Sequence, residues 1–101
     1  MKSFGDMVKQ AQKMQKQMSE MQERLAEERF EASAGGGAVT AIVDGKQMLK
    51  SLKIGPDAMK DGDASLLEDL IVAAVGEAQR SSETHMNETL SKLTGGFKLP
   101  F

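Results

Sequence analysis

The chain has 101 residues and a mass of 10.9 kDa, which is the usual size of one domain. Thirteen Lys and Arg residues against fifteen Asp and Glu residues give a formal net charge of −2. Cysteine is absent, which excludes disulfides, thiolate catalysis and cysteine-based metal centres. No apolar run approaches the roughly 20 residues of a membrane helix. The composition predicts a soluble intracellular protein.

Residues 4–29 are predicted to form a long helix, because they lack proline and are rich in Gln, Lys, Met, Glu and Ala. Apolar side chains recur along them in alternating steps of three and four, at Phe4, Met7, Ala11, Met14, Met18, Met21 and Leu25. This stripe is narrow, which favours a seam with a second copy over a broad core face. The alternative is a helix that lies on the sheet of its own chain.

The charge on the polar side of the same helix changes from positive to negative along its length. Its first part carries four lysines against one aspartate, at Lys2, Lys9, Lys13, Lys16 and Asp6. Residues 20–31 carry five glutamates against two arginines. One interpretation is a cationic surface for an anionic partner, and the other is a solvated face stabilised by pairs four residues apart.

Residues 30–54 change to a period of two and predict three antiparallel strands. Phe30 begins the first run, Gly35-Gly36-Gly37 forms a turn, and Asp44-Gly45 predicts a tight type I′ hairpin. The triple glycine lies between strands and is followed by no Lys-Ser/Thr pair, so a phosphate-binding loop is not expected.

Residues 65–93 predict a second long helix. Ser65 and Glu68 form a possible capping box at its start, and the first half of the helix carries a wide apolar face that should cover the sheet. The short apolar tail at 97–101 is expected to dock on the body or on a partner. The predicted fold class is α+β: a long helix, a three-stranded antiparallel sheet and a long helix in a single domain.

Catalytic patterns are not found in the sequence. Asp57, Asp61 and Asp63 begin like a calcium loop, but the later ligands do not follow, so no metal site is predicted. His85 has no nucleophile pattern nearby and is expected to be a surface residue. We therefore expect neither an enzyme nor a small-molecule substrate.

Four segments together resemble the YbaB/EbfC family of bacterial nucleoid-associated proteins. Residues 7–15 (MVKQAQKMQ) are similar to the opening of that family, and residues 67–75 (LEDLIVAAV) to its second helix. Residues 54–56 (IGP) resemble the end of its last strand, and residues 96–101 (GFKLPF) its C-terminal motif. Gly55 and Gly76 depart from the usual Asp and Asn of the family.

The resemblance implies a cytoplasmic, nucleoid-associated protein without a cofactor. It also implies a tweezer-like homodimer with a strand-rich centre that binds double-stranded DNA. The expected dimer interface combines the helical stripe with the strand residues Val39, Ala41 and Val43. Phosphate contacts with little sequence preference are expected, because lysine supplies a point charge rather than a bidentate base contact. The expected DNA-binding residues are Lys2, Lys9, Lys13, Lys16, Gln10, Gln12, Gln17, Arg80 and Lys92.

A different function stays open at this point. The acidic part of the first helix and its Met-rich stripe also suit a structural protein whose paired helices hold a protein partner. Absence of binding to duplex DNA at two salt concentrations, together with co-purification of one other protein, would favour that alternative.

Overall fold

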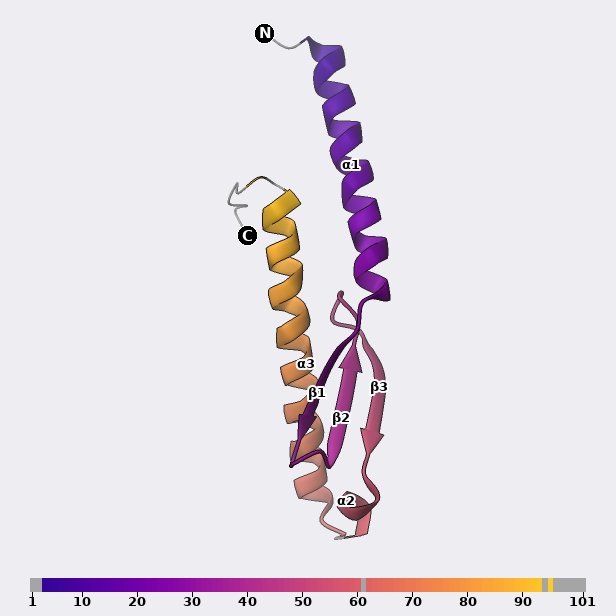
Figure 1. The fold of residues 1–101 in the computed structure, drawn as a ribbon, viewed down its shortest axis with the longest axis vertical. Coiled ribbons are helices and arrows are strands. Elements are labelled where there is room, and N and C mark those ends of the chain that lie inside the picture. Colours follow the sequence, from indigo (N-terminus) through magenta and orange to yellow (C-terminus); the bar gives the residue numbers. More distant parts are fainter. Residues whose placement is uncertain (1–2, 61, 94, 96–101) are drawn as a thin grey trace.

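A computed structural model describes residues 3–60, 62–93 and 95 of the chain. Lys2 and the apolar tail at 97–101 lie outside the described residues. The elements follow the order α1 (Phe4–Glu27), β1 (Phe30–Ala34), β2 (Val39–Val43), β3 (Leu49–Ile54), α2 (Pro56–Lys60) and α3 (Ala64–Leu93), as Figure 1 shows. This arrangement confirms the predicted α+β class and the three strands between two long helices.

The three strands form an antiparallel sheet in the order β1-β2-β3. Phe30 is opposite Val43 in the first pair, and Val39 is opposite Ile54 in the second. The turn between β1 and β2 is made by the triple glycine, in which all three residues have positive φ. Glycine adopts that conformation without steric cost, so this segment suits a turn far better than a strand.

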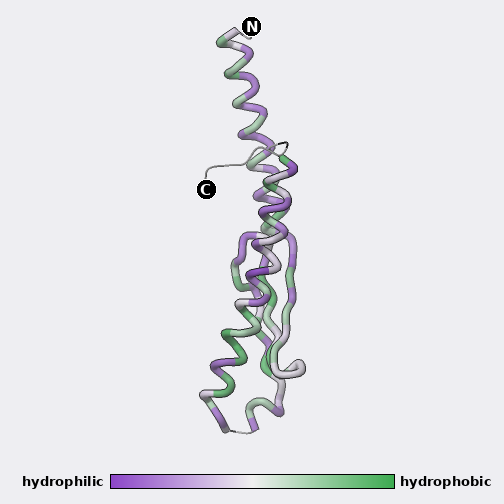
Figure 2. The backbone as a smooth tube through the Cα atoms, turned by 90° about the vertical axis from the view of Figure 1, so that its left-hand side faces the viewer, coloured by the Kyte–Doolittle hydropathy of each residue, from purple (hydrophilic) through white to green (hydrophobic). Residues whose placement is uncertain are grey.

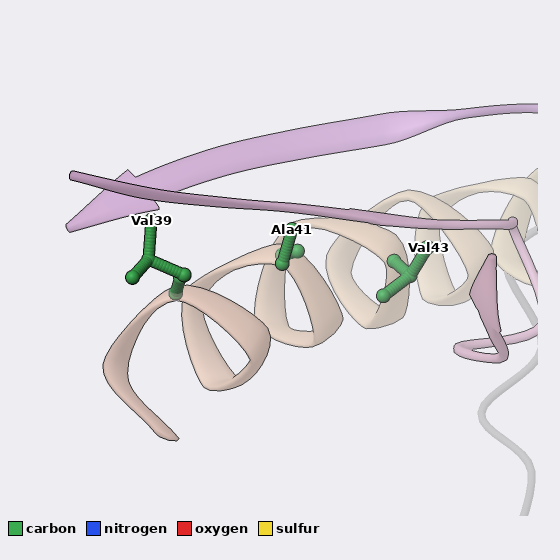
Figure 3. Packing of buried hydrophobic residues seen from close by; sticks show 5 residues of the cluster. Val39, Ala41 and Val43 are labelled. Atoms are coloured by element: carbon green, nitrogen blue, oxygen red, sulfur yellow. The ribbon is translucent and has the colours of Figure 1, made fainter. Parts of the chain in front are cut away.

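The core lies between α3 and the sheet. Val39, Ala41 and Val43 of β2 are fully buried and point towards α3 (Figure 3), where Ala74 and Ala78 are equally buried. Alanine on both sides lets the helix approach the strands closely, and larger side chains such as Leu67, Leu70 and Ile71 pack at the margin.

The helix α1 projects from this body as an arm, which makes the molecule 69 Å long but only 22 by 16 Å across (Figure 1). Ser3 caps its start by accepting a hydrogen bond from the Asp6 amide at 3.2 Å. It ends at Glu27, two residues before the predicted end, because Glu28 has extended backbone angles. The Arg29 guanidinium donates to the carbonyls of Ala26 and Glu28, both at 2.9 Å, and so satisfies this terminus.

The connection between β2 and β3 differs from the predicted type I′ turn. It is a longer loop over residues 44–48, and Gln47, not Gly45, has positive φ. The Asp44 carboxylate organises this loop by accepting from the amides of Lys46 at 2.8 Å and Met48 at 3.0 Å. An aspartate that bonds to its own following backbone is a frequent alternative to a tight glycine turn.

The start of α3 also differs from its prediction. Asp63, rather than Ser65, caps the helix, because its Oδ1 accepts from the Leu66 amide at 3.0 Å. The predicted capping box is therefore wrong. The short helix α2 lies between β3 and α3, and its five residues are too few to show a helical period in the sequence. At Gly76 α3 continues without interruption.

Candidate nucleic-acid interface

Three lysines share one exposed face of the α1 arm. Lys9, Lys13 and Lys16 follow each other at steps of four and three, which places them on one side of a helix, opposite the apolar stripe. Further along the arm this face becomes acidic, at Glu20, Glu23 and Glu27. The cationic surface is thus confined to the part of the arm that projects furthest from the body.

The opposite end of the molecule is acidic. Residues 56–70, which contain α2 and the first turns of α3, hold five Asp and Glu residues against one lysine. The modest net charge of −2 therefore conceals a dipolar molecule. A polyanion is attracted to the free end of the arm and repelled from the end that carries α2.

The other described residues that were predicted to contact DNA lie on two helices. Gln10, Gln12 and Gln17 are exposed on α1 beside the lysine face. Lys92 is exposed in the last turn of α3, which extends from the sheet in the same direction as the arm (Figure 1). Arg80 lies in the middle of α3 and forms an ion pair with Glu77 at 3.0 Å, so it is not grouped with the lysines of the arm.

The apolar stripe of α1 is uncovered only in its first part. Phe4 keeps 81% of its surface exposed, and Met7, Ala11 and Met14 are also exposed, while Met18 is half-buried. Figure 2 shows hydrophobic and hydrophilic residues alternating along the arm, and stronger hydrophobic segments in the first half of α3. The prediction that Met21 and Leu25 belong to the seam with a second copy needs correction, because both side chains are buried within a single chain.

The strand residues assigned to the dimer interface also need correction. Val39, Ala41 and Val43 have no exposed surface and face α3 of their own chain. Their period of two along β2 is typical of a strand with one covered face, and the cover is the chain's own helix α3. They are core residues, and a second copy cannot reach their side chains.

A different apolar strip is exposed next to this core. Leu52 and Ile54 of β3 are the direct partners of Ala41 and Val39, so their side chains lie on the same face of the sheet as the core. The helix α3 packs over β1 and β2, whereas Leu52 and Ile54 each keep 37% of their surface exposed. Leu49, the partner of Val43, extends this surface, which we call the β3 strip: Leu49, Leu52 and Ile54.

The arm joins the body at the loop over residues 44–48. The Gly45 amide donates to the Leu25 carbonyl at 2.7 Å, so the last turn of α1 is bonded directly to the loop. The helix α3 holds the loop from the other side, because Ser82 Oγ donates to the Asp44 carbonyl at 2.8 Å and Gln79 to the Gln47 carbonyl at 3.2 Å. These contacts between α1, the loop over residues 44–48 and α3, which we call the joint, fix the direction in which the arm leaves the sheet.

His85 takes part in the same joint, although it was predicted as a surface residue. It is half-buried, and its Nε2 lies 2.7 Å from a carboxylate oxygen of Glu28, just after α1. Its ring also packs against Phe30 at the start of β1, with 5.3 Å between centroids. A lone histidine in a polar stretch gave no sequence signal for these contacts.

Asp44 is the buried charge of this joint. Burial alone would raise the pKa of its carboxyl, but the Met48 and Lys46 amides, with the charges of Lys50 and Arg29, together hold the pKa below the ordinary value of 3.8. A lowered pKa means that the ionised form stabilises the fold above about pH 4. This contribution is lost as the pH falls through the pKa of the folded state.

Replacing Asp44 should therefore weaken the fold in a pH-dependent way. We expect Asp44→Ala to lower the free energy of unfolding at pH 7 by about 1–3 kcal/mol, because two loop amides lose their acceptor. Asp44→Asn keeps an acceptor oxygen but not the charge. Urea unfolding measures the free energy of unfolding of wild type and Asp44→Asn at pH 7 and pH 3. The difference between the two proteins should become smaller at pH 3, and an unchanged difference would contradict the claim that ionised Asp44 stabilises the fold.

Neither a metal site nor a membrane span emerges from the part of the chain that the structure describes. Residues 3–60, 62–93 and 95 contain no group of three metal-ligating side chains. Within the same residues, no helix combines the length and the apolar character that crossing a bilayer requires.

Comparison with known proteins agrees with the fold and the sequence motifs. The model of the YbaB/EbfC DNA-binding family matches residues 1–97. A nucleoid-associated protein of Thermoanaerobacter pseudethanolicus is 42% identical over 98 residues, which cover 97% of this chain and 88% of that protein. One of Gemmatimonas aurantiaca is 48% identical over 95 residues, which cover 94% of this chain and 91% of that protein.

A solved structure confirms the architecture independently. The crystal structure of an uncharacterized protein of Helicobacter pylori superposes with a TM-score of 0.85 at 17% sequence identity, and the match covers 93% of this chain and 99% of that one. At this identity the likeness concerns the fold alone. The family match over nearly the whole chain decides the assignment: the chain belongs to the YbaB/EbfC DNA-binding family.

Proposed function

We propose that this chain is a nucleoid-associated protein that binds double-stranded DNA through the lysine face of its α1 arm. The observation that carries the proposal is the grouping of Lys9, Lys13 and Lys16 on one exposed face, at the end of the molecule remote from the acidic α2 region. The family and the names of its relatives support DNA as the partner. Lys2 precedes this face in sequence and adds a fourth positive charge.

Phosphate contacts with low sequence specificity follow from the chemistry of the face. Lysine offers a flexible ammonium group that acts as a point charge, whereas the planar guanidinium of arginine makes bidentate contacts. Gln10, Gln12 and Gln17 add hydrogen-bonding groups beside the lysines. A protein of this kind would coat or organise DNA in the cytoplasm and influence gene expression broadly rather than at one operator.

Titration of a labelled duplex of about 25 base pairs, followed by fluorescence anisotropy, tests this proposal. Binding should weaken log-linearly between 50 and 200 mM salt, with a slope of about −0.9 for each phosphate contacted. Two duplexes of unrelated sequence should differ by less than about threefold. Absence of binding at the lowest salt would contradict the proposal and favour a protein partner for the arm.

The active form is proposed to be a homodimer whose main contact is the β3 strip. Three exposed apolar side chains lie there beside the core, on the edge strand of the sheet: Leu49, Leu52 and Ile54. The exposed part of the α1 stripe adds a second contact along the arms. Alanine and methionine make a weak helical seam, so this second contact is the lesser one. Pairing along the stripe leaves the lysines on the outer side of each arm.

A charge in the β3 strip should therefore separate the two copies. Leu52→Glu buries a carboxylate at the proposed contact, and the mass measured by light scattering should fall from twice 10.9 kDa to 10.9 kDa. Lys53→Glu alters the opposite face of the same strand and serves as the control that stays dimeric. A Leu52→Glu chain that stays dimeric, or a wild type that is monomeric at micromolar concentration, would exclude this interface.

A further inference from the structure

An open apolar hollow lies at the end of the molecule that carries α2. It has a volume of about 270 Å³ and is lined by Leu66, Leu67 and Leu70 of α3, by Ala58 of α2 and by residues near the β1–β2 turn. A second hollow of about 150 Å³ shares Ala58, Asp63 and Leu67 with it. The two together form a continuous apolar depression between α2 and α3.

The rim of this depression is acidic. Asp57 and Asp63 line the larger hollow together with the leucines. Asp63 uses one oxygen to cap α3, and Asp57 is paired with Lys60 only at 3.8 Å, with both side chains largely exposed. Such a surface pair contributes little, so the carboxylates keep their negative potential. The hollow suits an apolar segment that carries a positive charge.

The chain itself contains a segment of that chemistry. Residues 97–101 (FKLPF) place one lysine among two phenylalanines, a leucine and a proline, without an acidic residue. Proline is poorly compatible with the interior of a helix, and it disfavours the helical region for the residue before it. Apolar side chains and a single lysine match a leucine-lined hollow with an aspartate rim.

The segment of the same molecule cannot reach this hollow. It follows Gly95, just after the C-terminal end of α3, whereas the hollow is lined by residues of the first turns of α3. Figure 1 shows that these two ends of α3 are far apart. From Gly95 to Leu70, the nearest α3 residue of the lining, the distance along the helix is about 38 Å. Six extended residues span at most about 21 Å. An occupant with this sequence must come from another copy.

We propose that the hollow between α2 and α3 binds the segment 97–101 of a second copy of the chain. The contact joins two different patches, at opposite ends of α3. It therefore links copies in addition to any two-fold contact through the β3 strip, and such heterologous contacts can extend an assembly. It uses none of the lysines of the arm, so it stands independently of DNA binding.

A labelled peptide with the sequence of residues 95–101, titrated into the full chain without DNA, tests this contact by fluorescence anisotropy. Saturable binding is expected, and Leu66→Arg should weaken it at least about tenfold by filling the hollow and repelling the peptide lysine. Val72→Arg is the matched control: Val72 lies on α3, outside the lining, and is 71% exposed against 50% for Leu66. It should leave the affinity unchanged.

Two further samples complete the test. A peptide with glutamate in place of its lysine should bind at least about tenfold more weakly, because of the acidic rim. Leu66→Ala removes apolar contact without adding charge, and it should also weaken binding if Leu66→Arg fails to fold. The proposal is overturned if the peptide does not bind at about 1 mM, if Leu66→Arg and Val72→Arg have equal effects, or if both peptides bind equally.

Discussion

Replacing Lys9, Lys13 and Lys16 together by glutamine should lower the affinity for duplex DNA at least about 100-fold at 50 mM salt. The three side chains form the exposed cationic face of the α1 arm, and glutamine removes their charge while keeping a good helix former. The salt dependence should also become shallower, by about one unit of slope for each phosphate contact that is lost. Anisotropy titrations at several salt concentrations measure both quantities on the same samples.

A second triple variant controls for total charge. Lys46, Lys53 and Lys60 are exposed on the body, and replacing them by glutamine removes the same number of charges. This control should change the affinity by less than about threefold, because long-range attraction between exposed charges is screened by salt. Equal losses in the two variants would show that net charge, and not the arm, determines binding.

Gly45→Ala should lower the free energy of unfolding by about 1–3 kcal/mol. A Cβ atom at this position would lie 2.6 Å from the carbonyl oxygen of Leu25 and 2.9 Å from its Cα. Both are backbone atoms, so the joint itself must move. For a domain of this size the melting temperature should fall by roughly 5–20 °C. Thermal unfolding followed by circular dichroism measures this change.

Gly76→Ala provides the matched control for this prediction. A Cβ at Gly76 meets only the end of the flexible Arg80 side chain, at 3.4 Å, and the position lies inside a helix. The same substitution should here raise the free energy of unfolding by up to about 1 kcal/mol. If both variants shifted the stability in the same direction, the close approach of the arm to Gly45 would not be the reason for the glycine.

Periodicity predicted the elements because each long element carries its signal over several turns. The heptad spacing from Phe4 onwards indicated a helix, and the alternation around Val39 and Val43 indicated a strand. The joint was missed because its determinants are distant in sequence. Ser82 donates to the Asp44 carbonyl across 38 residues, and the need for a glycine at position 45 arises only when Leu25 is placed against it.

The candidate site was predictable to the extent that it lies on one helix. The spacing of Lys9, Lys13 and Lys16 alone predicts a common face, and the structure places them on one. Val39 was assigned to a dimer interface, but its side chain is covered by α3 of the same chain. An alternating pattern shows that one face of a strand is covered, but it does not show whether the chain itself or a second copy covers it. That distinction depends on α3 lying over β1 and β2 and leaving Leu52 exposed, which no local pattern indicates.

Acetylation of the lysines, with and without saturating duplex DNA and followed by mass spectrometry, tests the central claim most directly. The account predicts that DNA protects Lys9, Lys13 and Lys16 from modification at low salt, while Lys53 and Lys60 of the same molecules react at an unchanged rate. Protection of the two body lysines with the arm lysines still reactive would contradict the claim that the α1 arm is the DNA-binding surface.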